Sequence, residues 1–292
     1  MASKFFAVFD DIAVLMDDVA TMSKYATQKT AGILADDLAV NAEKASGFSA
    51  SRELIVLWRI AKGSLLNKII ILPAAFLLSA FLPGVIIPIL LLGGLYLAYE
   101  GVEKVYTYLF HRESKEKKKQ LLQNDEQAAS YENEKVKSAI VVDFILSVEI
   151  IIIALSTVAD QPLNIQIPVV TVVALLATVG VYGLVALIVR MDNLGLNLIA
   201  SSENKSSFKA KLGRGLVKLL PWVVRSLTVL GTLAMILVGG GIYAHNVDFI
   251  HNLLRTWPTL LADFLVGLCL GALAVVVMKL YESIKKNFAK AT

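Results

Sequence analysis

Two acidic side chains within one long apolar stretch are the residues of this sequence best placed to do chemistry. The stretch is Ala139–Val158, AIVVDFILSVEIIIIALSTV, and it holds Asp143 and Glu149. An ionised side chain in bilayer hydrocarbon costs about 2.5–3.5 kcal/mol on insertion scales, so such groups usually face a bundle interior or a wet cavity. The two acids therefore predict an ion or proton site. The alternative is a pair of structural acids, hydrogen-bonded or protonated between helices.

The two acids do not share one face of their helix. They are six residues apart, which is about 240° around a helix at 100° per residue. Asp143 is expected near the cytoplasmic end, where it could be partly solvated, and Glu149 is expected deeper and is the sharper candidate. Arg225, in another apolar run, is a candidate ion-pair partner for Asp143 because both are expected near the cytoplasmic side.

The composition indicates a membrane protein. The 292 residues are 57% hydrophobic and 18% charged, and the mean hydropathy is +0.68. A soluble domain of this length carries more charge. The net charge of +4 lies in loops beside apolar runs, which indicates topology rather than a nucleic-acid surface. The single cysteine, Cys269, excludes a disulfide within the chain and a zinc site built from cysteines.

The apolar runs predict an all-α, polytopic helical membrane protein with about six membrane segments. One pair of segments is a hairpin interrupted at Pro83-Gly84. Its first arm, Ile69–Leu82, is short, so it is either re-entrant or extended backward through Leu65 and Leu66. The predicted domains are 1–62, amphipathic acidic helices; 63–103, a membrane hairpin; 104–137, a charged loop; 138–190, a hairpin; 191–218, a basic loop; 219–284, a hairpin; and 285–292, a tail.

Lysine and arginine are concentrated in 104–137, in 190–218 and in the C-terminal tail, and are scarce in the other connections. The positive-inside rule places such loops in the cytoplasm. With six crossings, both termini are expected to be cytoplasmic, and residues 1–62 are expected to be cytoplasmic or interfacial.

Acidic residues outside the apolar runs suggest a second feature. These acidic residues form either a solvated acidic face or a vestibule that attracts cations, because clustered like charges raise the local concentration of counter-ions. The residues are Asp10, Asp11, Asp17, Asp18, Asp36, Asp37, Glu100 and Glu103.

Glycines and histidines offer weaker candidates. The triplet Gly239, Gly240 and Gly241 is either a packing face or an unwound turn that exposes carbonyls to an ion, and Gly267-x-x-x-Gly271 has the spacing that lets helices approach closely. His245, Asp248 and His251 suggest a metal site but lack a fourth ligand. The chain shows no HExxH, GxSxG or Walker A motif. We therefore expect no enzyme activity and no cofactor.

A family resemblance follows from four runs: KTAGILADDLAVNAEKASGF, IAKGSLLNKIIILPAAFLLSAFLP, VVDFILSVEIIIIALSTV and GTLAMILVGGGIYAH. Together they resemble the YedI-like family of bacterial inner-membrane proteins over nearly the whole chain. This resemblance implies a multi-pass protein of the bacterial inner membrane and implies no activity. The run DFILSVE also resembles one helix of the TerC-like metal-ion exporters, whose second acidic motif is not evident here.

Two functions remain open at this point. The first is a cation or proton-coupled transporter or channel with Asp143 and Glu149 as its site. The second is a non-transporting membrane scaffold or envelope assembly protein with structurally buried acids. The expected partners are the lipid bilayer, a cation or proton, and further copies of the chain in a homo-oligomer.

Overall fold

The computed structural model describes residues 2–45, 50–110, 125–202 and 207–291. The regular elements within these ranges are helical, as the sequence predicts. They are α1 (Ala2–Ala45), α2 (Ala50–Phe81), the 3-10 turn η1 (Pro83–Val85), α3 (Ile86–Phe110), α5 (Asp125–Thr157), α6 (Leu163–Val189), α7 (Met191–Ala200), α8 (Phe208–Asn246), α9 (Asp248–Leu254) and α10 (Thr259–Ala291).

Six helices in the described part of the chain are long and apolar enough to cross a membrane. Their lengths of 23 to 39 residues exceed the ~20 residues that a bilayer core requires. The chain is therefore an all-α, multi-pass membrane protein. The six spans are Arg52–Phe81, Pro83–Leu109, Ala129–Thr157, Leu163–Val189, Phe208–Asn246 and Thr259–Tyr281.

The first membrane hairpin consists of two full-length arms. Helix α2 runs without interruption from Ala50 to Phe81, so the first arm extends backward and is not re-entrant. The boundary expected at 62/63 falls inside this helix. The chain reverses at Pro83-Gly84 as predicted, and Val85 donates its N–H to the carbonyl of Leu82 at 3.0 Å. Proline and glycine at this position end one helix and begin the next.

Helix α8 is continuous through its three glycines, so the unwound turn expected at Gly239, Gly240 and Gly241 is absent. These glycines allow other helices to approach instead. A Cβ added at Gly240 would collide with the carbonyl oxygen of Asp263 on α10, and one at Gly239 would press on Gly94 of α3. On α10, Gly267 and Gly271 likewise allow a close approach, Gly267 to α8 and Gly271 to α3.

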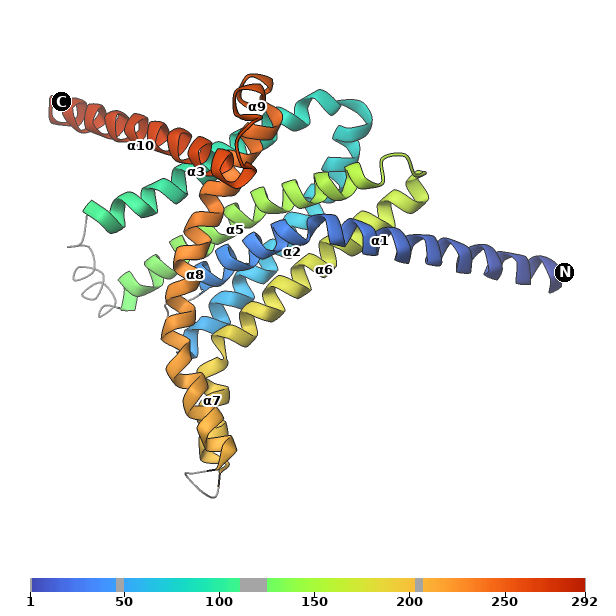
Figure 1. The fold of residues 1–292 in the computed structure, drawn as a ribbon, viewed down its shortest axis with the longest axis horizontal. Helices are drawn as coiled ribbons and strands as arrows, with labels where there is room; N and C mark the ends of the chain where they lie inside the picture. The colour runs from blue at the N-terminus through green and yellow to red at the C-terminus, as the bar shows by residue number, and fades with distance from the viewer. Residues whose placement is uncertain (1, 46–49, 111–124, 203–206, 292) are drawn as a thin grey trace.

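Helix α1 packs inside the bundle rather than apart from it. It lies against α5, α6 and α8, and Figure 1 shows its N-terminal third extending past the connection between α5 and α6. With 44 residues it is about 66 Å long. Helix α1 therefore does not form a region separate from the membrane-spanning helices, while the cytoplasmic or interfacial location expected for residues 1–62 stays a prediction.

Two apolar clusters enclose a polar layer in the middle of the bundle. One cluster includes Ile71 and Ile150, and the other includes Ile60 and Ala139. Each cluster takes residues from α1, α2, α5 and α6. Between them, the same four helices turn polar side chains toward one another. This polar layer is the candidate site.

Candidate functional site

Helix α2 supplies three polar side chains from one face. Ser64, Asn67 and Lys68 recur at spacings of three and four residues, which places them on adjacent turns of the same side. All three are buried: Ser64 is 0% exposed, Asn67 9% and Lys68 3%. They face α5, the helix that carries Asp143.

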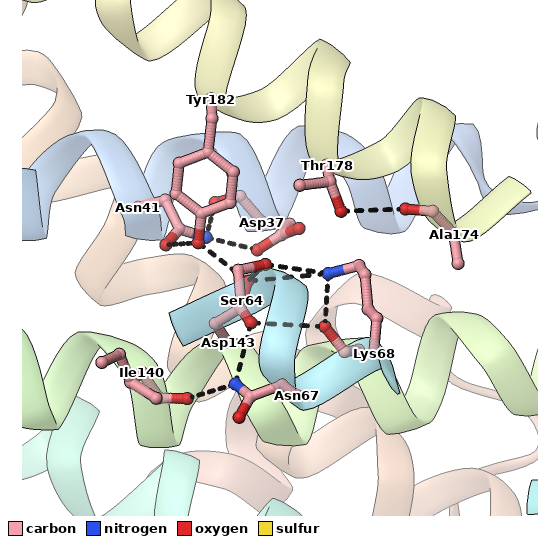
Figure 2. Close-up of polar contacts among 11 residues, drawn as sticks. Asp37, Asn41, Ser64, Asn67, Lys68, Ile140, Asp143, Ala174, Thr178 and Tyr182 are labelled. Atoms are coloured by element: carbon pink, nitrogen blue, oxygen red, sulfur yellow. Dashed lines mark hydrogen bonds and ion pairs between the residues drawn. The ribbon is translucent and has the colours of Figure 1, made fainter. Parts of the chain in front are cut away.

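Asp143 lies at the centre of the polar layer and is 1% exposed. The hydroxyl of Ser64 donates to its Oδ1 at 2.8 Å, and the hydroxyl of Tyr182 from α6 donates to the same oxygen at 2.9 Å. The amide Nδ2 of Asn67 donates to Oδ2 at 3.1 Å. Both carboxylate oxygens are thus satisfied by neutral donors from two neighbouring helices (Figure 2).

Lys68 is the cation of the site, but its ammonium is closest to two hydroxyls. Its Nζ donates to Oγ of Ser147 at 2.8 Å and to Oγ of Ser64 at 3.0 Å. The distance from Nζ to Oδ1 of Asp143 is 3.9 Å. Ser64 therefore bridges the ammonium and the carboxylate, as Figure 2 shows.

Helix α1 adds a second acid. Asp37 is 3% exposed, and Nδ2 of Asn41 donates to its carboxylate and to its backbone carbonyl one turn away. The hydroxyl of Tyr182 lies 3.1 Å from Oδ1 of Asn41 and 2.9 Å from Oδ1 of Asp143. A phenol has one proton, so it serves one of these two acceptors at a time. Tyr182 thus connects the α1 half of the site to the α5 half.

The charges of this layer do not balance when every group is ionised. Asp37 and Asp143 carry two negative charges, and Lys68 carries one positive charge. Unbalanced charge in a medium of low dielectric is costly unless a proton or a bound cation offsets it. The site can therefore hold one proton or one monovalent cation without leaving net charge.

A pair of acids lies beside this layer. Asp36 on α1 is close enough to Glu149 on α5 for the two carboxylates to repel each other. Both side chains are partly buried, and the Oε2 atom of Glu149 is buried without a hydrogen-bond partner among the described residues. The pair adds negative charge next to the Asp37 and Asp143 carboxylates.

Asp143, which was expected to be partly solvated, is completely buried within the protein, whereas Glu149 is partly buried. Their expected order of depth in the membrane stays a prediction. Arg225 is exposed on α8 and is not among the groups that contact Asp143. The expected Arg225–Asp143 ion pair is therefore wrong, and Lys68 takes its place.

The acid pairs of α1 do not gather into a vestibule. Asp17 and Asp18 are exposed, whereas Asp37 is buried. The side chains of Asp10 and Asp11 lie outside the described residues. A straight helix separates residues 10 and 37 by about 40 Å, so the pairs cannot share one cavity.

The remaining acids expected at a vestibule also have separate surroundings. Glu103 is exposed. Glu100 is buried and forms an ion pair with Lys44 of α1, and the hydroxyl of Ser138 donates to it at 3.0 Å. Lys104 is paired with Glu43 at 2.7 Å. This second ionic cluster links α1, α3 and α5 at the C-terminal end of α1.

Six residues of the site were missed from the sequence alone: Asn41, Ser64, Asn67, Lys68, Ser147 and Tyr182. Lys68 was the available signal, because a lysine directly before an apolar run is an ionisable residue at a membrane segment. The first arm predicted from Ile69 begins too late, because the span in the structure begins at Arg52 and includes Lys68.

The histidines and acids suggested as metal ligands do not form a metal centre in the described part of the chain. Within the described ranges no group of three His, Cys, Asp or Glu side chains could hold a metal ion. His245 instead lies 2.7 Å from the carbonyl of Gly241. A groove of about 140 Å³ opens between α2, α3 and α5, and it is lined by apolar side chains such as Ile70, Ile86 and Phe144.

Comparison with known proteins yields one match. A family model described as "Protein of unknown function (DUF808)" matches residues 3–284. No curated protein and no solved structure matches the chain. The resemblance to an uncharacterised family is thus confirmed over nearly the whole chain, while nothing connects the match with a YedI-named family.

Proposed function

Since the chain belongs to the DUF808 family, whose description assigns no activity, we propose a function from the site: a cation or proton-coupled transporter or channel. One observation carries this proposal. Two buried acids, Asp37 and Asp143, interact electrostatically with one buried lysine, Lys68, whose ammonium lies 3.9 Å from Asp143. Ionisable residues at membrane depth are costly, and they commonly mark ion pathways and proton relays.

The side chains around Lys68 suggest how the site would work. The ammonium donates hydrogen bonds to the hydroxyls of Ser64 and Ser147. The hydroxyl of Ser64 therefore bridges the ammonium and Asp143. A proton or monovalent cation that binds Asp143 or Asp37 would neutralise the excess acid. Glu149 and Asp36 beside the site would raise the local concentration of cations.

Flux measurements in proteoliposomes test this proposal. The wild-type protein is expected to dissipate a proton gradient or a gradient of one cation, and Asp143→Asn and Glu149→Gln are expected to abolish that flux. Asp17→Asn is the matched control, because Asp17 is an exposed aspartate of α1. A wild-type protein that moves neither protons nor any of several cations would contradict the proposal.

A second function is favoured by the hydrogen bonding of Asp143. Both of its oxygens accept bonds from neutral donors, and the groove nearby is apolar. These contacts suit a non-transporting scaffold in which the acids connect helices. In that case Asp143→Asn would lower the melting temperature in detergent, and the wild-type protein would show no flux.

The membrane and its orientation are part of the proposal. We place the protein in the bacterial inner membrane, with 111–124, 190–218 and the C-terminal residues 285–292 on the cytoplasmic side, because these segments are rich in lysine and arginine. We also propose that the protein is not an enzyme, needs no cofactor and binds no nucleic acid.

Assembly into a homo-oligomer is the remaining proposal. Gly267 and Gly271, which first suggested it, pack within the chain against α8 and α3. Gly180 and Gly183 on α6 are exposed, and a Cβ at either would meet nothing within 4 Å. They leave a small-residue face for another helix. Light scattering of the purified protein, with Gly183→Leu as the variant, tests whether this face joins two copies.

A further inference from the structure

Helix α1 is too polar to be found as a membrane span. Its segment 22–45 carries six charged residues: Lys24, Lys29, Asp36, Asp37, Glu43 and Lys44. It is not among the six candidate spans of the described chain. A hydropathy argument therefore leaves it outside the membrane, as the sequence-based expectation for 1–62 did.

The packing of α1 contradicts that location. Near the start of α6, Ala26 is buried in one cluster with Val169. Near the end of α6, Ala45 is buried in one cluster with Val189. Between these points the hydroxyl of Tyr182 is bonded to Asn41. Helix α1 therefore runs parallel to α6 over the length of a helix that is itself long enough to span the bilayer.

The charged groups of α1 are placed where a bilayer can tolerate them. Asp37 lies in the polar layer, Asp36 is partly buried beside Glu149, and Glu43 and Lys44 are engaged in ion pairs with Lys104 and Glu100. Toward the other end Lys24 and Lys29 are exposed, and long lysine side chains can snorkel to the headgroups.

Between Lys29 and Asp36, Ala31 and Ala35 are the exposed residues of α1 among those whose side chains the structure describes. Neither side chain brings a charge or a hydrogen-bonding group to the lipid. The segment 22–45 thus meets the requirements for a crossing that is sheltered by its neighbours.

We propose that α1 is a seventh membrane crossing, parallel to α6, so that residues 13–18 lie on the opposite side of the membrane from the α7–α8 connection and the C-terminal end of α10. This replaces the expectation that both termini are cytoplasmic, which rested on six crossings. Figure 1 shows the two ends of the chain at opposite ends of the long axis. Residues 1–24 contain four aspartates and two lysines, which suits the non-cytoplasmic side.

Cysteine labelling of the full-length protein in spheroplasts tests the proposal. Cys269 is first replaced by serine, which leaves no thiol. Single cysteines are then introduced at Ala13 of α1, Asn252 of α9 and Leu212 of α8, all exposed. A membrane-impermeant maleimide is applied before and after permeabilisation. Gel filtration of each variant confirms that it elutes as the parent protein does.

A crossing and a non-crossing α1 predict different labelling patterns. We expect Ala13→Cys to be labelled under the same condition as Asn252→Cys, and Leu212→Cys under the opposite one. Labelling of Ala13→Cys together with Leu212→Cys would overturn the proposal, because α1 would then return to the side from which α8 starts. Failure to label Ala13→Cys in either condition would also overturn it, since the residue would not reach water. The result does not depend on any transport activity.

Discussion

The ammonium of Lys68 lies 3.9 Å from Oδ1 of Asp143, yet it is more than 0.8 Å closer to the hydroxyls of Ser64 and Ser147, at 3.0 and 2.8 Å. The buried cation is therefore held by neutral oxygens, and Ser64 connects it to the acid. In such an arrangement the carboxylate and the ammonium stabilise each other, but each can change its charge state without losing every partner. The consequences can be measured by substitution.

Removal of the cation leaves its acids uncompensated. Lys68→Met should destabilise the protein by about 3–5 kcal/mol, the range for breaking a buried ion pair at one partner. Lys68→Met combined with Asp143→Asn should recover part of this loss, because the double variant buries fewer charges. Thermal unfolding in detergent measures both. A double variant whose loss equals the sum of the losses from Lys68→Met alone and Asp143→Asn alone would show that the two groups are not coupled.

Tyr182→Phe removes the hydroxyl that bridges α6 to Asn41 and Asp143. We expect a loss of about 1–3 kcal/mol, since buried acceptors lose their donor. Tyr25→Phe on the exposed face of α1 is the matched control and should change stability little. Unfolding curves for the two variants give the comparison. A Tyr182→Phe protein as stable as the control would mean that Ser64 and Asn67 satisfy Asp143 unaided.

Glu149→Gln should separate transport from stability. Its Oε2 atom is buried without a partner, and the carboxylate is repelled by Asp36. Neutralising it therefore removes an unfavourable interaction, so the melting temperature should stay equal or rise. Under the proposed function, cation or proton flux should nevertheless be lost. A marked drop in melting temperature would identify Glu149 as a structural group, and unchanged flux would remove it from the transport site.

Gly267→Ala tests the contact between α8 and α10. A Cβ at this position would collide with the carbonyl oxygen of Ile236, and backbone atoms cannot move aside without separating the helices. We expect the variant to lose the folded state or to melt at a much lower temperature. Gly183→Ala is the control, because its Cβ would meet nothing within 4 Å and alanine is favoured over glycine in a helix by up to about 1 kcal/mol. A Gly267→Ala protein that melts with the control would show that the contact can relax.

The six apolar spans and the turn at Pro83-Gly84 could be predicted because each depends on local sequence. An apolar run of about 20 residues has few stable locations other than a bilayer, and proline with glycine interrupts a helix wherever they fall. Asp143 was found for the same reason, since an acid in such a run is costly. These inferences require no knowledge of which helices are neighbours.

The partners of Asp143 could not be predicted because they depend on helix rotation and on distant segments. Arg225 was a candidate only by its depth, and the sequence does not show that its face of α8 is exposed. Lys68 lies 75 residues before Asp143 in the sequence, and Tyr182 is 39 residues after it. Helix α1 was misplaced because hydropathy measures suitability for lipid contact, whereas α1 is sheltered by α5, α6 and α8.

The position of α1 among later helices implies an order in which the helices enter the bundle. Asn41 and its partner Tyr182 are separated by 141 residues, so α1 leaves the ribosome long before α6 exists. At roughly 5–20 residues per second, this interval is about 7–28 s. During that time the site around Asp37 is incomplete, because α6 and its Tyr182 are not yet made, and a helix with six charges cannot remain unsheltered in lipid. Helix α1 must therefore wait at the membrane surface or with an insertion factor, and it enters the bundle after its neighbours. In a ribosome-bound chain that ends before α6, a cysteine placed at Ala26, which is buried in the complete chain, should accordingly react with a water-soluble maleimide, whereas in the complete chain it should not.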